Sequence, residues 1–559
     1  MFENQPKGLF ALALANTGER FGYYTMLAVF ALFLRANFGL EAATAGQIYS
    51  TFLALVYFLP LVGGILADKI GYGKCVTIGI MVMFAGYVLL AVPLGADKLA
   101  MGAMIAALVL ISFGTGLFKG NLQVMVGNLY DDPKYADKRD AAFSLFYMAI
   151  NIGAMFAPTA AVKIMDWAQT SFGVSVNDSY HFAFMVACAS LILSIVIYYA
   201  CRPWFKHVEN SAKQAAATGG AKVEELTPEQ TKKRIVALCL VFAVVIFFWM
   251  AFHQNGLTLT YFADEFVNPI VTGIQTMPFN VFNLALIAIM VYCLFGILGS
   301  SNSKKKDIFS LITMIAGGAL LFLSNIIEQS TTNLILIIAM ISGAFCWSQS
   351  NATMKKVLSS LILFISGGIL AYQAYTVGNN TMEISAPIFQ QFNPFYVVAL
   401  TPFSMALFGA LAKKGKEPSA PRKIALGMVV ATIAYIVMAV ACVGLLTPNA
   451  QELARVTGDP TFVNANVLIY TYLILTFAEL LLSPMGISFV TKVAPPKYKG
   501  MMMGGWFVAT AIGNYLVSIG GNLWGDMPLW GVWSVFVAVC AIAAIFMFAM
   551  MKKLEDATK

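Results

Sequence analysis

Long apolar stretches alternate with short polar ones along almost the whole chain. A helix needs about 20 apolar residues to cross a lipid bilayer, and stretches of roughly that length recur sixteen times. They fall at about 9–34, 46–66, 75–94, 99–126, 141–163, 181–201, 235–261, 280–299, 308–326, 333–350, 357–375, 388–412, 424–446, 464–488, 501–523 and 529–551. The pattern predicts an all-α polytopic membrane protein with sixteen membrane-spanning helices.

The longest polar stretch, residues 203–234, separates the first six predicted helices from the rest. It contains Ala-Ala-Ala-Thr-Gly-Gly, a composition typical of flexible linkers. It then continues through Thr227-Pro228-Glu229-Gln230, which has the residues of a capping box with proline at the first helical position. We therefore expect a linker that leads directly into the seventh helix.

Composition excludes a soluble globular protein. Of the 559 residues, 59% are apolar and 11% are charged, whereas soluble domains carry about 25% charged residues.

The distribution of basic residues indicates how the chain is oriented. If successive helices cross the membrane in opposite directions, both termini lie on one side, and all but six of the 35 Lys and Arg fall in loops on that side or at the termini. The exceptions are Arg35, Lys98, Lys163 and Arg455 on the opposite side, and Arg20 and Lys119 inside helices. By the positive-inside rule both termini are cytoplasmic, and the net charge of +8 does not indicate nucleic acid binding.

The eight cysteines lie singly in or beside apolar segments, without a CxxC pair or a nearby histidine cluster. We expect them to pack as small apolar residues rather than to form disulfides or a metal site. The sequence also shows no nucleophile and base at catalytic spacing. We therefore predict that the protein is not an enzyme and holds no cofactor.

The first predicted helix carries two adjacent charges, Glu19 and Arg20, near its centre. A charged side chain there costs roughly 2.5–3.5 kcal/mol on insertion scales, and such residues usually mark a transport pathway or a binding cavity. Helical spacing lets five polar residues of this segment point into one cavity. They are Asn16, Glu19, Arg20, Tyr23 and Tyr24. The alternative is a structural ion pair between packed helices.

Two further charges lie inside predicted helices, Lys119 in the N-terminal half and Glu479 in the C-terminal half. With Glu19 and Arg20 they sum to zero, as buried charges do when they neutralise one another. A pair drawn from opposite halves can close a gate in one conformation and separate in another. The alternative is a static contact between two helices.

Polar and aromatic side chains join these charges at the same depth. They are Tyr57, Asn151, Trp249, His253, Gln254, Asn393 and Trp506. A buried amide must find hydrogen-bond partners, although Asn393 precedes Pro394 and could instead cap a helix. Tyr and Trp in membrane helices often only pack or anchor the helix at the interface. Together the set suits a small zwitterion that contains amides.

The same residues resemble a known family. The segment from Asn16 to Tyr24 is similar to the first-helix motif Glu-x-x-Glu-Arg-Phe-x-Tyr-Tyr of the proton-dependent oligopeptide transporter family. The loop from Gly64 to Lys74 resembles a motif of the major facilitator superfamily, to which that family belongs. Further segments match in order: Phe118-Lys119-Gly120-Asn121, Phe143 to Met155, Phe248-Trp249, Phe392-Asn393-Pro394, Glu479 to Pro484 and Met502 to Phe507. The resemblance covers roughly 1–262 and 386–550.

This resemblance implies a major facilitator superfamily fold, with 12 core transmembrane helices in two six-helix bundles plus about four inserted helices. The expected domains are an N-terminal bundle (1–202), a cytoplasmic linker (203–234), the first helix of the C-terminal bundle (235–279), the inserted transmembrane helices (280–375) and the remainder of the C-terminal bundle (376–559). We expect the inserted helices to pack at the periphery or to form an oligomer contact.

The resemblance further implies a secondary active transporter of the plasma membrane, in particular a bacterial inner membrane, that imports di- and tripeptides by alternating access. Protons would be the coupling ion, and a monomer would suffice for transport. Family roles at matching positions give the expected substrate site: Arg20, Tyr23, Tyr24, Tyr57, Lys119, Asn151, Trp249, Asn393, Glu479 and Trp506. The residues expected for proton coupling and gating are Glu19, Arg20, Lys119, His253 and Glu479.

Three departures from the family pattern bear on proton coupling and architecture. Asn16 stands where the family has a glutamate associated with coupling, and an amide does not titrate. His253 stands where many members have an acid on helix seven that pairs with a first-helix arginine in the outer gate. The four extra helices lie between the seventh and eighth core helices, whereas relatives usually insert two between the sixth and seventh.

We therefore expect Glu479 or Glu19 to carry the proton, with His253 as a third candidate or as a neutral hydrogen-bonding group. Conformations that make or break a contact between Glu479 and Lys119 would change how tightly Glu479 holds a proton. Two other classes of function stay open. One is transport of another small organic anion or peptide-like compound, since one fold serves many substrates. The other is a non-transporting membrane sensor or scaffold built on the inserted helices.

Overall fold

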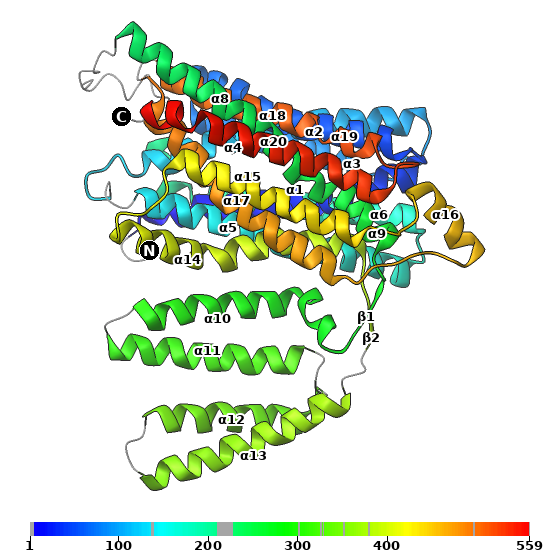
Figure 1. Cartoon of the computed structure of the whole chain (residues 1–559), viewed down its shortest axis with the longest axis vertical. Helices are drawn as coiled ribbons and strands as arrows, with labels where there is room; N and C mark the ends of the chain where they lie inside the picture. Colours follow the sequence, from blue (N-terminus) through cyan, green and yellow to red (C-terminus); the bar gives the residue numbers. More distant parts are fainter. Residues whose placement is uncertain are drawn as a thin grey trace.

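The computed structural model describes residues 5–135, 139–209, 227–299, 302–324, 327, 329–349, 353–377, 381–495 and 498–557. Within these ranges, sixteen segments are helical, long and apolar enough to cross a membrane. This is the number that the hydrophobic pattern predicts. Twelve of them form the core of the molecule and four form the insertion (Figure 1).

The N-terminal half is a bundle of six long helices. They are α1 (Lys7–Phe38), α2 (Ala42–Ile70), α3 (Tyr72–Ala91), α4 (Lys98–Asn128), α5 (Arg139–Phe172) and α6 (Val176–Ala200). Glycines let their backbones approach closely: a Cβ atom at Gly63 of α2 would lie 2.1 Å from the carbonyl oxygen of Gly116 in α4. Small residues at helix contacts are typical of membrane bundles, where dispersion contacts stabilise packing in place of the hydrophobic effect.

The C-terminal half contains six further spans, several of which are interrupted. They are α8 (Pro228–Phe252) with η4 (His253–Gly256) and α9 (Thr258–Phe266), η6 (Ala386–Gln391) with α14 (Phe392–Lys413), α15 (Ala420–Ala441), α17 (Asn466–Val493), α18 (Lys499–Tyr515) with α19 (Ser518–Asn522), and α20 (Leu529–Asp556). The short α16 (Pro448–Thr457) connects α15 to α17.

The seventh span differs in its bounds from the predicted helix at 235–261. It begins at Pro228, where Thr227 and Gln230 form the predicted capping box. The apolar pattern does not indicate this first part of the helix, because it contains the charged residues Lys232, Lys233 and Arg234. The span then breaks at His253, which begins the 3₁₀ turn η4.

The predicted linker, 203–234, is only partly described, because residues 210–226 lie outside the described ranges. Its beginning is structured as two short 3₁₀ turns, η2 (Arg202–Trp204) and η3 (Lys206–Val208). The carbonyl oxygen of Glu209 accepts a hydrogen bond from the backbone N–H of Gly73 at 3.1 Å. Both carboxylate oxygens of Glu209 accept from the Arg202 guanidinium. The first turns of the linker are therefore attached to the first turn of α3.

The four inserted helices lie to one side of the core (Figure 1). They are α10 (Val281–Gly299), α11 (Ser303–Leu323), α12 (Thr331–Gln349) and α13 (Thr353–Val377). The first of them contacts the core through aromatic rings. The ring centroids of Phe295 and of Phe403 in α14 are 4.8 Å apart, and those of Phe282 and of Phe156 in α5 are 5.9 Å apart.

The two ends of the insertion are held together by a short antiparallel sheet. Strand β1 (Ile270–Thr272) pairs with β2 (Thr381–Glu383), with Thr272 opposite Thr381. The 3₁₀ segment η5 (Gly273–Phe279) follows β1 and leads to α10. The point where the chain enters the insertion and the point where it returns to the core therefore lie side by side.

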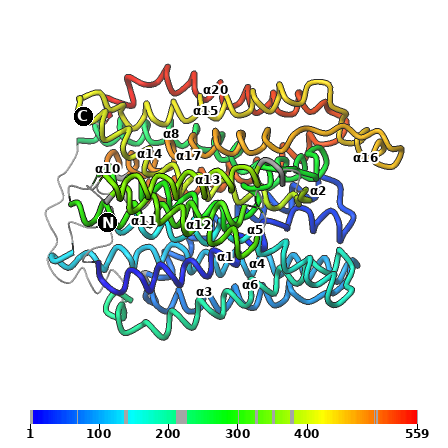
Figure 2. The backbone as a smooth tube through the Cα atoms, turned by 90° about the horizontal axis from the view of Figure 1, so that it is seen from below, coloured from blue at the N-terminus to red at the C-terminus, as the bar shows by residue number. Residues whose placement is uncertain are grey.

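Both chain ends lie at the same end of the molecule, and α16 lies at the other (Figures 1 and 2). We call the end with the termini the inner end and the end with α16 the outer end. This arrangement follows from the even number of spans between the termini.

Candidate functional site

The two charges of α1 pair with each other. The Nε atom of Arg20 lies 2.5 Å from Oε2 of Glu19, a second guanidinium nitrogen lies 2.5 Å from Oε1, and both side chains are buried. The guanidinium also lies 4.6 Å from the centre of the Tyr23 ring. The ion pair therefore forms within one helix, whereas the structural alternative assumed a pair between two helices.

Lys119 of α4 has no such counter-charge. Among the described residues it forms no ion pair, and its ammonium lies 4.1 Å from the centre of the Tyr57 ring. A cation over an aromatic ring is stabilised by the ring's quadrupole, but by less than a carboxylate would provide in a desolvated site. This ammonium remains available to an anion.

Glu479 of α17 is buried and is held by neutral donors. The Nδ2 atom of Asn393 donates to Oε2 at 2.9 Å, and the Tyr147 hydroxyl donates to Oε1 at 3.3 Å. Asn393 also donates to the hydroxyl of Thr476 at 3.0 Å. No cation in the described ranges lies within ion-pair distance of this carboxylate. Lys119 and Glu479 are therefore not paired in this conformation.

This arrangement decides the role of Asn393 in the helix. The residue lies inside α14, where Gln391 occupies the N-cap position, and its side chain bonds across to α17. The interpretation of Asn393 as a helix cap is wrong.

The hydrogen bond from Tyr147 comes from α5 in the N-terminal half, so Glu479 contacts both halves. Asn151, one turn along α5, donates to the carbonyl oxygen of Tyr147 at 2.9 Å.

A second polar group surrounds His253 at the break in the seventh span. Its Nδ1 atom lies 2.6 Å from Oδ1 of Asn514 in α18, and its ring stacks on Trp249 with centroids 4.9 Å apart. The Tyr57 ring, which contacts the Lys119 ammonium, has its centroid 6.0 Å from the centroid of the His253 ring. The buried Nε1 of Trp249 and Nδ2 of Asn514 have no hydrogen-bond partner among the described residues.

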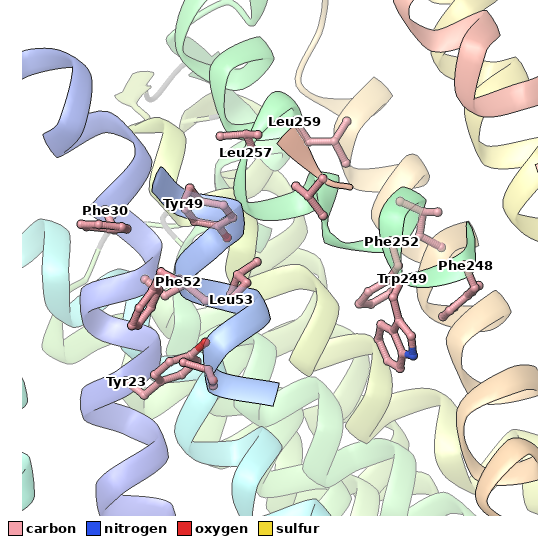
Figure 3. Close-up of a cluster of buried hydrophobic side chains, with 14 of the residues drawn as sticks. Tyr23, Phe30, Tyr49, Phe52, Leu53, Phe248, Trp249, Phe252, Leu257 and Leu259 are labelled. Carbon is pink, nitrogen blue, oxygen red and sulfur yellow. The ribbon is translucent and has the colours of Figure 1, made fainter. Parts of the chain in front are cut away.

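Aromatic rings from both halves lie in the region of Trp249. Figure 3 shows Tyr23 and Phe52 from α1 and α2 on one side, and Phe248, Trp249 and Phe252 from α8 on the other.

Two of the predicted polar and aromatic residues, Trp506 and Gln254, make structural contacts among the described residues. Trp506 packs against Gly486, where an added Cβ would lie 2.0 Å from its ring. Gln254 donates to the carbonyl oxygens of Met250 and Val517 and so ties α8 to the end of α18.

Three polar residues at this site were not predicted. They are Tyr147, Thr476 and Asn514. Asn514 is a buried amide in an apolar helix and could have been found by the argument that singled out Asn151. Tyr147 lies one helical turn before Asn151, so the same helical spacing points to it. Thr476 gives no signal in the sequence, because a threonine in a membrane helix usually bonds to its own backbone.

A large cleft lies away from these residues. It has a volume of about 1020 Å³, opens at the outer end, and is lined by Arg35, Glu265, Trp524 and Arg455 among others. Neither Lys119 nor Glu479 lines it. Arg35 and Glu265 were also not predicted as site residues, because charges at helix ends look like ordinary loop charges.

The chain is similar in sequence to known membrane transport proteins. A family model described as the POT family matches residues 74–223 and 357–526. Dipeptide and tripeptide permease A of Klebsiella pneumoniae (strain 342) is 26% identical over 511 residues, which cover 91% of this chain and 82% of that protein. The di-/tripeptide transporter of Lactococcus lactis subsp. lactis (strain IL1403) is 27% identical over 525 residues, 91% of this chain and 87% of that protein.

Solved structures show the same fold. The crystal structure of peptide transporter POT in complex with sulfate has a TM-score of 0.60 at 24% identity, covering 100% of this chain and 96% of that chain. The crystal structure of tetrameric PepTSo2 has a TM-score of 0.62 at 18% identity, covering 99% of each chain. The predicted fold class, with its two bundles and inserted helices, is confirmed.

Proposed function

The chain belongs to the POT family, and on that premise we propose that it is a proton-coupled symporter that carries di- and tripeptides into the cytoplasm by alternating access. Curated relatives that match over 91% of this chain are named as a dipeptide and tripeptide permease and a di-/tripeptide transporter. The relatives are bacterial, which supports a bacterial inner membrane as the location.

The observation that carries the proposal is a pair of opposite charges without counter-charges. Lys119 in the N-terminal half and Glu479 in the C-terminal half form no ion pair among the described residues. Burying a charge is costly unless it is paired and hydrogen-bonded. A peptide zwitterion supplies both missing charges, with its ammonium at Glu479 and its carboxylate at Lys119.

Neutral groups near these charges suit the peptide bond. The buried N–H groups of Trp249 and Asn514 lack acceptors among the described residues, and a peptide carbonyl oxygen is an acceptor. Asn393 and Asn151 add amides near Glu479. The rings of Tyr23, Tyr24 and Tyr57, with Trp249, would form the walls of side-chain pockets. We keep Arg20 as a second cation for the carboxylate, although Glu19 neutralises it in this conformation.

We infer that Glu479 is the better proton carrier of the predicted candidates. Both oxygens of Glu19 already accept from Arg20, whereas Glu479 has neutral partners only. The Nδ1 atom of His253 lies 2.6 Å from Oδ1 of Asn514, an acceptor that suits the ring in its neutral and its protonated form alike, so this contact does not separate the two predicted roles of His253. In another conformation of the cycle Lys119 and Glu479 would approach and pair. A proton on Glu479 would weaken that pair and leave Lys119 to the substrate carboxylate.

Both termini would face the cytoplasm, as the distribution of basic residues indicates. A monomer would suffice for transport, although one structural relative is described as tetrameric.

Uptake of labelled dialanine into proteoliposomes tests the proposal. The purified protein is reconstituted with and without an inward proton gradient, and empty liposomes serve as the control. We expect accumulation above the external concentration only with the gradient. Equilibration without accumulation would make the protein a facilitator, and absence of uptake would overturn the peptide assignment.

A further inference from the structure

Three polar side chains form a short hydrogen-bonded chain inside the C-terminal half. The Thr476 hydroxyl donates to the carbonyl oxygen of Tyr472, one turn earlier in α17, at 2.7 Å. The same hydroxyl oxygen accepts from Nδ2 of Asn393 at 3.0 Å, and Nδ2 also donates to Oε2 of Glu479 at 2.9 Å. Thr476 is fully buried, so water does not compete for its hydroxyl.

The hydroxyl of Thr476 can only accept from Asn393. A hydroxyl group has one hydrogen, and that of Thr476 is used on the Tyr472 carbonyl. An amide oxygen placed against it would bring lone pairs against lone pairs, which repel. The amide nitrogen of Asn393 therefore lies against Thr476, and its two hydrogens are used on Thr476 and Glu479.

This orientation leaves the amide oxygen of Asn393 accessible. Asn393 is half-buried, and its Oδ1 atom forms no hydrogen bond among the described residues. Oδ1 is also not one of the enclosed polar atoms that lack a partner, so water or a substrate can reach it. A substrate ammonium at Glu479 would have this oxygen as a second acceptor.

The carboxylate alone cannot keep this orientation through a proton cycle. While Glu479 is ionised it only accepts hydrogen bonds, so it holds the amide nitrogen toward itself. Once protonated it carries an O–H, which can donate to the amide oxygen if the Asn393 amide turns over. The Thr476 hydroxyl does not titrate, so it opposes this turn equally in both states of Glu479.

We propose that Thr476 is a positioning residue for proton transfer: it keeps the Asn393 amide in one orientation and thereby directs the proton to Oε1 of Glu479. Oε2 continues to accept from Asn393, and the carbonyl oxygen of a carboxylic acid is a better acceptor than its hydroxyl oxygen. The new O–H bond therefore forms at Oε1, 3.3 Å from the Tyr147 hydroxyl. That hydroxyl stops donating to Oε1 and accepts instead, and no other bond to hydrogen forms or breaks. This role of Thr476 rests on the proposed function, in which Glu479 carries the proton.

The titratable groups that interact with Glu479 from other elements are phenols. They are Tyr147 on α5, Tyr24 on α1 and Tyr57 on α2. Phenols ionise at about pH 10, well above the range of the tests below. Among these groups and Glu479, the carboxylate is therefore the one whose protonation changes in those tests.

Substitutions at Thr476 and one matched control test the proposal. Thr476→Val removes the hydroxyl at nearly constant volume, Thr476→Ala removes it without adding a methyl group, and Thr476→Ser keeps it. Thr471→Val is the control, because Thr471 lies on the same helix, is equally buried and donates to the carbonyl oxygen of Val467 at 2.7 Å. Within the described part of the chain it forms no hydrogen bond with Asn393. Stability lost with a buried hydroxyl is thus common to both valine variants.

The first measurement does not require transport. The C=O stretch of protonated Glu479 is recorded in infrared difference spectra of the purified protein between acidic and alkaline pH, and it is assigned by its absence in Glu479→Gln. We expect a higher frequency in Thr476→Val and Thr476→Ala, because the turned amide no longer donates to the carbonyl oxygen. Thr476→Ser and Thr471→Val should leave the band at the parent position.

The second measurement is the KM for dialanine in counterflow at the same two pH values. At acidic pH, the KM of Thr476→Val should rise about tenfold, the size of one hydrogen bond to a charged group. The reason is that the turned amide presents N–H groups, in place of Oδ1, to the substrate ammonium. At alkaline pH, where Glu479 is ionised, the KM should equal that of the parent. Serine should restore the parent KM at both pH values.

Three results would overturn the role of Thr476: an unshifted band in Thr476→Val and Thr476→Ala, an equal shift in Thr471→Val, or no Glu479-dependent band in the parent. The two measurements also keep the two proposals apart. The expected band shifts in a protein that does not move dialanine would support the positioning role and refute the peptide function. Gradient-driven dialanine uptake with unshifted bands would do the reverse.

Discussion

A buried carboxylate at the centre of the bundle is stabilised by neutral donors from both halves. Asn393 and Tyr147 donate to Glu479, and Tyr147 belongs to the N-terminal half. Hydrogen bonds to a charged group contribute about 1.5–3 kcal/mol each. Adding or removing the charge of Glu479 therefore changes how strongly the two halves hold together at this point.

We expect Glu479→Gln to abolish acid-driven accumulation of dialanine while leaving counterflow of preloaded peptide. The amide has the same shape and can still accept from Asn393, but it cannot bind and release a proton. Accumulation ratios and counterflow rates in proteoliposomes measure the two effects separately. Glu229→Gln is the matched control, because that carboxylate is exposed and pairs with Lys233 one turn away. Persistent accumulation in Glu479→Gln would show that the proton resides elsewhere.

At the level of helices, contact between α2 and α4 depends on glycine. A Cβ atom at Gly63 would lie 2.1 Å from the Gly116 oxygen, whereas a Cβ at Gly64 would meet no atom within 4 Å. The two glycines are adjacent in sequence but lie on different faces of α2. They therefore form a natural pair of test positions.

Gly63→Ala should destabilise the protein and Gly64→Ala should not. Overpacking of a close contact typically costs about 1–3 kcal/mol, so we expect Gly63→Ala to lower the melting temperature of the purified protein and its folded yield. Thermal unfolding in detergent, followed by size-exclusion chromatography, measures both. Equal melting temperatures for the two variants would show that α2 and α4 can move apart without loss of stability.

The number and order of the helices could be predicted because long apolar runs and basic loops are strong signals. The break at His253 was not predicted, although the four residues of the 3₁₀ turn, His253 to Gly256, interrupt the apolar pattern with three polar side chains and a glycine. The charges Lys119 and Glu479 could be singled out by their cost in a membrane. Their actual partners could not, because Asn393 and Tyr57 are far from them in sequence.

The same limit explains why the ion pair between Arg35 and Glu265 at the outer end was missed. Arg35 and Glu265 lie at helix ends, where charges are common and inexpensive, so nothing in the pattern of either segment marks them. The acid expected on helix seven is replaced by His253, and the acid that meets a first-helix arginine in the structure is Glu265, twelve positions later. Only the tertiary structure brings it to Arg35.

For the whole molecule, the pairing of β1 with β2 makes the insertion separable from the core. Thr272 lies opposite Thr381 in an antiparallel pair, and two residues are enough to connect such strands. The inserted helices meet the core mainly through α10, which packs on α14 and α5. None of the predicted site residues belongs to the insertion.

We expect a variant in which residues 273–380 are replaced by Asn-Gly to fold and to transport. Its stability should fall, because Phe279 would no longer contact Phe389 and Phe392. Size-exclusion chromatography and dialanine uptake measure the two properties. Deletion of α13 alone is the control: removing one span reverses the orientation of everything after it and should abolish transport. Loss of the folded core in the first variant would contradict a separable insertion.

The orientation of the molecule gives a further prediction. Because the loops of the inner end are rich in Lys and Arg, a green fluorescent protein fused after residue 557 should fluoresce, and alkaline phosphatase at the same point should be inactive. A fusion after Gly458, at the outer end beside α16, should give the opposite pair of results. Active phosphatase at the C-terminus would mean that the outer cleft faces the cytoplasm.

The pairing of Glu19 with Arg20 has a consequence for how the protein is made. A nascent chain delivers its helices to the bilayer one after another, and α1 arrives before any segment that will later surround it. Its two charges already satisfy each other along the same helix, so the segment carries no net charge at its centre when it leaves the insertion machinery. The first helix can thus settle in lipid by itself and serve as the template on which the following ones assemble.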